Sequence, residues 1–299
     1  MIDKTYLPFE PKNLYKHYLG NAERQVNYFI RSVEKYHEFM NENQDLEGVP
    51  ITKSMKPRQI EKDEKFWTVT ALKSVFDHPN SKEIWKLILS KSFGMNPPIQ
   101  GMKSWSECLK GEINLYFEAQ IPSPVKYTNW LQDHIKDSHF IPYVLGAANR
   151  NSKRSLEGST HYDAILVNGS NGFSVMFEAK VLSDISKQVT FDIKRNQLAR
   201  CVDILLEENN ELPEALGKRV ADKSLFLLLT PNIFRENKWS RLYGWLLDEY
   251  RSNPNSLYRD LPHRDLNVCR SVASRIGWIT FEDINTACPG ACGWITKEF

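Results

Sequence analysis

The chain has 299 residues, of which 41% are hydrophobic and 25% are charged. This composition is typical of a globular protein and excludes wholesale disorder. The formal net charge of +2 is too small to indicate a nucleic-acid partner by itself, and no apolar run is long enough for us to expect a membrane partner. At roughly 100–200 residues per domain, the length allows one large domain or two modest ones.

Five cysteines are scattered along the chain, and the first residues lack the basic and apolar regions of a signal peptide. An odd number of widely spaced cysteines argues against a disulfide scaffold and favours a reducing compartment. We therefore expect a cytoplasmic protein.

The first hundred residues predict helices, because apolar residues recur at helical spacing in 21–43 and again in 60–76. A proline-containing connector follows, and the pattern changes after it. We therefore expect a helical N-terminal region over residues 1–100 and a second domain over residues 101–299.

The pattern of the second domain mixes helices and strands. Such an order buries a central sheet between helical layers. One apolar run, 224–230, predicts a strand that is covered on both faces. Besides it, we expect helices over 104–119, 192–208 and 236–250 and strands over 140–145 and 276–281.

Two further predicted strands, joined by a turn rich in Gly and Asn, carry the most informative side chains. They cover residues 161–167 and 173–180 and form a hairpin. If the turn is centred symmetrically, Asp163 lies directly opposite Glu178, and the two side chains share one face. Lys180 shares that face with Glu178, because side chains in a strand alternate with period two.

Two carboxylates side by side repel each other unless a cation lies between them. Mg²⁺ prefers oxygen ligands, and two carboxylates with a backbone carbonyl would supply part of its coordination shell. Lys180 beside such a site would stabilise negative charge on a phosphate and help to activate a water molecule. The set therefore predicts metal-assisted hydrolysis of a phosphodiester, although an exposed edge strand with cross-strand ion pairs would carry the same residues.

Asp163, followed by Glu178-Ala179-Lys180 on a hairpin and by a helix that bears Gln197, resembles the motif of the PD-(D/E)XK nuclease superfamily. The similarity covers residues 104–230, and the proline of the eponymous motif is missing before Asp163. The resemblance implies an α/β fold with a restriction-endonuclease-like central mixed sheet flanked by helices, here preceded by the helical N-terminal region.

On matching positions, the resemblance implies that Asp163, Glu178 and the backbone carbonyl of Ala179 hold a Mg²⁺ ion, for which Mn²⁺ can substitute. Lys180 would then be the catalytic lysine. These four residues form the core of the expected site.

Two further positions are expected from the same resemblance. Gln197 matches a polar residue that several members carry on the helix after the motif, although it would equally suit an ordinary helix amide. Many members also carry an acidic residue on the helix before the sheet. Glu112 fits that position best, with Glu118 as a weaker candidate, although Glu112 would equally suit a solvent-facing helix position.

The implied function is Mg²⁺-dependent cleavage of nucleic acid, with DNA favoured over RNA, by an endonuclease of the restriction or defence type. A homodimer is compatible with nucleases that cut two strands. Two alternatives stay open. One is a catalytically inactive nuclease-like protein that acts as a nucleic-acid-binding or assembly subunit. The other is an α/β interaction protein whose hairpin charges are structural.

Overall fold

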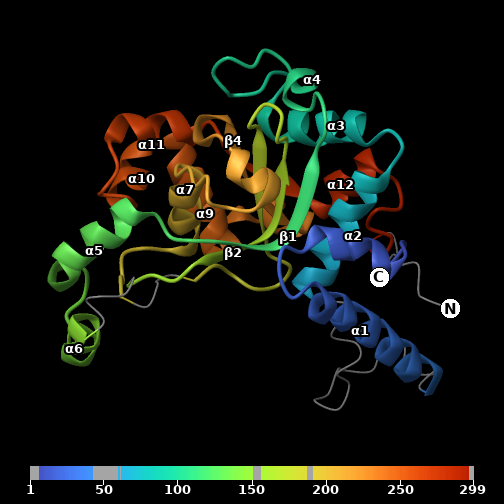
Figure 1. The fold of residues 1–299 in the computed structure, drawn as a ribbon, viewed down its shortest axis with the longest axis horizontal. Helices are drawn as coiled ribbons and strands as arrows, with labels where there is room; N and C mark the ends of the chain where they lie inside the picture. The colour runs from blue at the N-terminus through green and yellow to red at the C-terminus, as the bar shows by residue number, and fades with distance from the viewer. Residues whose placement is uncertain (1–6, 43–59, 61, 151–155, 187–190, 296–299) are drawn as a thin grey trace.

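A mixed β-sheet lies at the centre of the molecule, with helices on both of its faces (Figure 1). The computed structural model describes residues 7–42, 60, 62–150, 156–186 and 191–295. Within that part of the chain, the order of the five strands in the sheet follows their order in the sequence. The predicted α/β class with a central mixed sheet flanked by helices is therefore confirmed. The strands are β1 (Asn114–Ile121), β2 (Thr160–Val167), β3 (Ser174–Ala179), β4 (Ser224–Thr230) and β5 (Ile276–Thr280).

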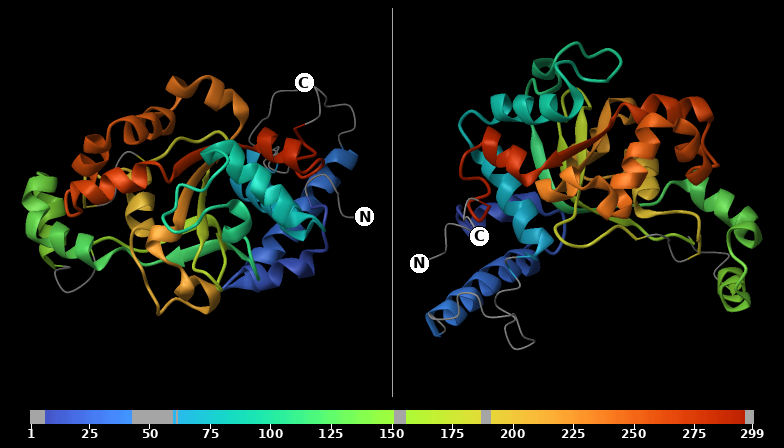
Figure 2. Two further views of the ribbon diagram at one scale, coloured as in Figure 1. Left: turned by 90° about the horizontal axis from the view of Figure 1, so that it is seen from above. Right: turned by 180° about the vertical axis from the view of Figure 1, so that it is seen from behind.

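Strand direction defines the two ends of the sheet. β2 runs antiparallel to both of its neighbours, whereas β3, β4 and β5 run parallel to one another. Consequently β1, β3, β4 and β5 end where β2 begins, and we call this the carboxyl end of the sheet. Two helical projections, α1 (Ala22–Glu42) and the pair α5 (Val125–Ser138) and α6 (Pro142–Arg150), extend past this end from opposite sides of the core (Figures 1 and 2).

The two faces of the sheet have different helical covers (Figures 1 and 2). One face packs against α2 (Glu64–Asp77), α3 (Ser81–Phe93) and α12 (Phe281–Ala287). The other packs against α7 (Gln197–Leu205) and α9 (Leu242–Ser252), with α10 (Pro254–Asp260) and α11 (Leu266–Ala273) beside them. The remaining short elements are η1 (Pro11–His17), α4 (Trp105–Cys108), η3 (Glu214–Lys218), η4 (Ala221–Lys223), α8 (Asn232–Glu236) and η5 (Lys238–Ser240).

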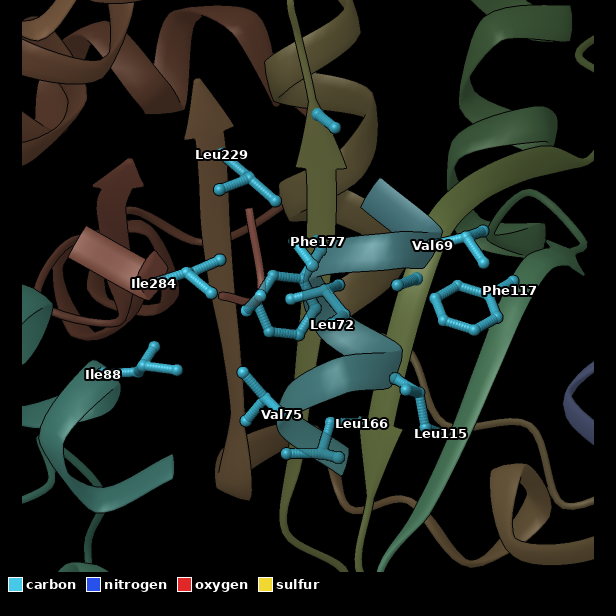
Figure 3. Packing of buried hydrophobic residues seen from close by; sticks show 14 of the residues in the cluster. Val69, Leu72, Val75, Ile88, Leu115, Phe117, Leu166, Phe177, Leu229 and Ile284 are labelled. Atoms are coloured by element: carbon cyan, nitrogen blue, oxygen red, sulfur yellow. The ribbon is translucent and has the colours of Figure 1, made fainter. Parts of the chain in front are cut away.

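The central strands bury both of their faces, and β4 shows why its sequence is continuously apolar. Leu227 and Leu229 belong to the cluster under α2 and α3, whereas Phe226 and Leu228 belong to the cluster under α7 and α9. Strands covered on both sides need apolar residues at every position. Figure 3 shows the first of these clusters, with Val69, Leu72 and Val75 of α2 near Phe117, Leu166 and Phe177 of the sheet.

The N-terminal helices share a hydrophobic core with the sheet. Phe29 of α1 and Phe66 of α2 lie in the same cluster as Phe117 of β1. The imidazole of His17, at the end of η1, places Nδ1 2.6 Å from the backbone carbonyl oxygen of Leu115. Residues on both sides of the boundary predicted after residue 100 therefore contribute to one hydrophobic cluster.

The helix predicted over 104–119 is wrong, because this segment forms the short α4 and then β1. Gly111, between them, has a φ of +96°, a left-handed conformation that interrupts a helix and favours glycine. Leu115 and Phe117 face α2, while Tyr116 lies in the cluster on the other face. Because both faces of β1 are buried, its apolar residues do not alternate with polar ones. Their positions are therefore also compatible with helical spacing.

Other predicted boundaries need correction outside the central hairpin. The strand predicted over 140–145 is wrong, because this segment belongs to α6, where Pro142 occupies the first helical position, at which proline needs no backbone N–H. The helix predicted over 236–250 is divided between α8, η5 and α9. The helix predicted from residue 192 starts at Gln197, because Asn196 caps it by accepting the backbone N–H of Ala199. The strands predicted over 161–167, 173–180, 224–230 and 276–281 are confirmed to within one residue at each end.

Candidate active site

The hairpin of β2 and β3 places Asp163 beside Glu178 at the carboxyl end of the sheet. Ala164 pairs with Phe177, so the next position along this register joins Asp163 to Glu178, and the predicted register is confirmed. The backbone N–H of Ala179 donates to Asp163 Oδ2 at 2.6 Å rather than to the backbone of β2. The two strands therefore separate at this point, with both acidic side chains at the place of separation.

Glu118 of β1 lies on the other side of Asp163. The strand pairs before and after it place Glu118 opposite Asp163. Its φ of +50° is unusual for a residue other than glycine, and its carboxylate lies 3.0 Å from Nζ of Lys65. Glu118, Asp163 and Glu178 consequently form one row across three antiparallel strands.

Glu178 is 2% exposed and is held by polar contacts from two directions. Its Oε1 accepts hydrogen bonds from Lys180 Nζ at 2.6 Å and from Gln197 Nε2 at 2.5 Å. Its Oε2 lies 3.8 Å from the thiol sulfur of Cys201, one turn further along α7. The structure therefore brings Gln197 directly to Glu178, and the start of α7 fixes the orientation of this carboxylate.

Lys180 follows directly after β3, and its backbone N–H donates to the carbonyl oxygen of Leu229 in β4 at 2.9 Å. The side chain is buried, with Nζ 2.6 Å from Glu178 and 3.6 Å from Glu64. Burial by itself lowers the pKa of the Lys180 ammonium, but the carboxylates of Glu178, Glu64 and Asp163 outweigh burial and raise the pKa above its ordinary value. Lys180 is therefore a permanent positive charge at neutral pH.

The two acidic residues of the hairpin differ from ordinary surface carboxylates. Burial raises the pKa of Asp163 well above its ordinary value, the nearby Glu178 carboxylate raises it further, and Lys180 opposes both effects. Burial also raises the pKa of Glu178, again against the opposing charge of Lys180. One ammonium thus only partly offsets the cost of burying two adjacent carboxylates.

The backbone at Ala179 directs its carbonyl oxygen toward Asp163. The peptide that joins Ala179 to Lys180 points its N–H at β4. Because the described peptide bonds are trans, the carbonyl of the same peptide points the opposite way, toward β2. The carbonyl oxygen of Ala179 therefore lies on the same side of β3 as its N–H group, which donates to Asp163.

Glu64 is a residue of this site that sequence reasoning missed. It opens α2, after Asp63 caps the helix by accepting the backbone N–H of Lys65 at 2.9 Å. Its carboxylate accepts the backbone N–H of Val181 at 3.3 Å and also contacts the Ser183 hydroxyl. The cap in the sequence signals a helix start at this position, but no local pattern links that start to the end of β3.

Glu112 lies at the opposite end of the sheet. It is in the loop before β1, where it borders a hollow of about 440 Å³ together with Ser170 and Glu214. The neighbouring Asn114 pairs with Val167, four strand residues from Asp163, which corresponds to about 13 Å. The structure therefore does not bring Glu112 to the other predicted site residues, and its predicted place on a helix is wrong.

Within the described ranges, no group of three or more His, Cys, Asp or Glu side chains gathers closely enough to hold a metal ion. None of the helices in the same ranges combines the length and apolarity that a bilayer crossing needs. No protein-family model matches the chain, and comparisons with characterised proteins and with solved structures gave no match. The observations thus define an α/β protein in which a buried pair of Glu178 and Lys180 lies beside Asp163 at the carboxyl end of the sheet.

Proposed function

We propose that this protein is a metal-dependent nuclease with a restriction-endonuclease-like fold, which hydrolyses phosphodiester bonds of nucleic acid, DNA in preference to RNA. The observation that carries the proposal is the convergence of Asp163, Glu178 and Lys180 where β2 and β3 separate. After the hairpin, α7 and β4 follow in the expected order of helix and strand, whereas β1 and α6 occupy the positions before it at which the sequence predicts a helix and a strand. An endonuclease of the restriction or defence type is the biological class that we favour.

The chemistry of the available donors fits Mg²⁺. This ion is usually bound in proteins by one or two carboxylates and keeps several water molecules, so it does not need a third acidic side chain. Asp163 and Glu178 would hold it, together with the carbonyl oxygen of Ala179. The raised pKa values of both carboxyls support this assignment, because they mark a place where added positive charge is favourable. When bound, Mg²⁺ lowers the pKa of a coordinated water molecule and stabilises negative charge on a phosphate.

The other polar residues of the site have positions that suit the same reaction. Lys180 holds its charge next to the two acids, where it can stabilise the negative charge that develops on a phosphate oxygen. Gln197 and Cys201 orient the Glu178 carboxylate from α7. We assign these two as positioning residues, because they act through Glu178.

Glu64 takes the place in the proposal that the resemblance gave to Glu112. Members of the superfamily often carry an acidic residue on the helix before the sheet, and α2 precedes β1 and packs against the sheet. The contact of Glu64 with Lys180, at 3.6 Å, supports a role in holding the lysine. Glu112 provides a matched control, since it lies at the far end of the same sheet.

The direct test is incubation of the purified protein with plasmid, linear duplex DNA, single-stranded DNA and RNA, in Mg²⁺, in Mn²⁺ and in EDTA. We expect cleavage with either ion, no cleavage in EDTA, and loss of cleavage in Asp163→Asn, with Glu112→Gln unchanged. Absence of cleavage on every substrate would refute the proposal. Nucleic-acid binding without cleavage would then favour the catalytically inactive alternative.

A further inference from the structure

An exposed tryptophan lies near the carboxyl end of the sheet. Trp239 belongs to η5, a short turn in the segment that follows β4, and is 63% exposed. Leu182, two residues after Lys180, is 56% exposed. The chain from Lys180 to Leu182 spans at most about 8 Å between Cα atoms. Two large apolar side chains are therefore exposed on the segments that follow β3 and β4 at this end of the sheet.

Hydrogen bonds tie the segment after Lys180 to the segment that carries Trp239. Arg241 donates from Nη2 to the backbone carbonyl of Leu182 at 3.3 Å. The carboxylate of Asp184 accepts the first two backbone N–H groups of α9, at 2.7 and 3.3 Å. The segments that carry Trp239 and Lys180 are therefore joined directly by hydrogen bonds.

The backbone under Trp239 is held closely against α9. A Cβ atom at Gly244 would lie 2.0 Å from the backbone carbonyl oxygen of Lys238, so this approach requires glycine. The ammonium of Lys238 lies 3.0 Å from the Asp248 carboxylate and 4.5 Å from the centre of the Trp239 ring. The indole is thus presented by a packed turn with a cation beside it.

We propose that Trp239, Leu182 and Arg241 form a stacking platform for an unpaired base of a nucleic-acid strand bound at the candidate active site. Aromatic rings bind bases in a sequence-tolerant way, and nearby cations hold the phosphate backbone. The guanidinium of Arg241 lies 4.7 Å from the Phe234 ring centre, and its Nε is buried without a hydrogen-bond partner in the described part of the chain. The inference rests on the proposed function, because it takes the strand at the site to be the ligand.

The size and charge of the platform favour a base over a second copy of the chain. A stable protein interface buries about 800 Å² on each partner, whereas a tryptophan side chain supplies at most about 250 Å². The ammonium of Lys238 lies beside the indole and Arg241 follows two residues later in the chain, whereas charged groups are depleted from the centres of protein interfaces. Both observations suit a single planar group attached to a phosphate backbone.

The test measures binding of a fluorescent single-stranded DNA oligonucleotide in EDTA, so that cleavage cannot interfere. We expect Trp239→Ala to weaken binding at least about fivefold and Trp239→Phe to restore most of the affinity, because a ring remains. Tyr258→Ala, which removes a 40% exposed ring on α10, serves as the control and should stay within about twofold of wild type. Trp239→Ala should keep the wild-type salt dependence, whereas Arg241→Gln should reduce it, since the arginine carries a positive charge and the indole does not.

Equal affinity of wild type and Trp239→Ala, or no binding of the oligonucleotide at all, would overturn the platform. A loss of self-association in Trp239→Ala, seen by sedimentation and without a change in oligonucleotide affinity, would assign the surface to a dimer instead. Binding that depends on Trp239 in a protein that never cleaves would support the platform and refute the nuclease. Cleavage by a protein whose oligonucleotide affinity is the same with and without Trp239 would support the nuclease and refute the platform.

Discussion

The carboxylate of Glu64 lies 3.6 Å from the ammonium of Lys180, and this contact joins the start of α2 to the end of β3. Lys180 also pairs with Glu178, which α7 holds from the opposite face of the sheet. Helices on both faces therefore fix the position of one lysine. This arrangement makes α2 a part of the candidate site as well as a cover for the sheet.

Replacement of Glu64 by Gln should lower the rate of nucleic-acid cleavage by about 10- to 100-fold. The variant removes a charge that holds Lys180, and a hydrogen bond or ion pair to a charged group is worth about 1.5–3 kcal/mol. Single-turnover cleavage rates at saturating Mg²⁺ provide the measurement. Glu112→Gln is the matched control and should leave the rate within about twofold. Equal rates for Glu64→Gln and wild type would remove Glu64 from the site.

Replacement of Asp163 by Asn should stabilise the metal-free protein near pH 7. The pKa of Asp163 in the folded protein lies well above its ordinary value of 3.8, so from about pH 4 upward the folded state binds more protons than the unfolded state. Stability then falls as pH rises through this range, and the Asn variant avoids the loss. Thermal denaturation in EDTA should give the variant the higher Tm at pH 7, with the difference shrinking toward pH 4.

Wild type and Asp163→Asn also show whether Mg²⁺ stabilises the protein through Asp163. Mg²⁺ should raise the Tm of the wild type and leave that of Asp163→Asn unchanged, because a ligand stabilises the state that binds it. An Asn variant that is less stable than wild type in EDTA at pH 7 would contradict the prediction that the charged Asp163 destabilises the metal-free fold.

Replacement of Asp203 by Asn should destabilise the fold by about 3–5 kcal/mol. Asp203 is fully buried and lies 2.9 Å from Arg195 and 2.7 Å from Arg264, and Arg195 is itself fully buried. The variant leaves a buried guanidinium short of one counter-charge. Urea unfolding measures the change. Asp222→Asn, at a 91% exposed side chain, is the control and should cost less than about 1 kcal/mol.

The imidazole of His17 should make the protein sensitive to mild acid. Burial lowers the pKa of His17 from 6.5 to about 4. A base with a lowered pKa stabilises the fold fully above pH 6.5, and this stability is lost as pH falls toward 4. Between pH 7 and pH 4.5, wild type should lose about 2 kcal/mol more than His17→Gln in urea unfolding. An identical loss in the two proteins would show that His17 titrates normally.

Much of the sheet could be predicted because its strands carry strong local signals. The turn rich in Gly and Asn fixes the hairpin and, through its length, the register that places Asp163 beside Glu178. The apolar run of β4 is preceded by Asp222 and Lys223 and is followed by Pro231 and Asn232, so its ends are clear in the sequence. These signals are local, so a single sequence contains them in full.

The predictions that were wrong or missing concern features that depend on contacts between distant segments. The sequence predicts a helix where β1 forms, because burial of both faces of the strand leaves its apolar residues without a polar–apolar alternation. Glu64 joins the site through a contact between distant segments, and helix capping by Asp63 does not disclose where the helix packs. Trp239 falls within the helix predicted over 236–250, whereas the structure exposes it on the short turn η5. Tertiary packing decides each of these cases.

The most direct test of the nuclease proposal is the cleavage rate of Lys180→Met at saturating Mg²⁺, compared with wild type and with the exposed control Lys110→Met. Loss of a group that stabilises developing charge typically costs about 100- to 1,000-fold in rate. We predict a loss of at least about 100-fold for Lys180→Met, with folding intact by circular dichroism, and wild-type rates for Lys110→Met. Cleavage by Lys180→Met at the wild-type rate would contradict the account.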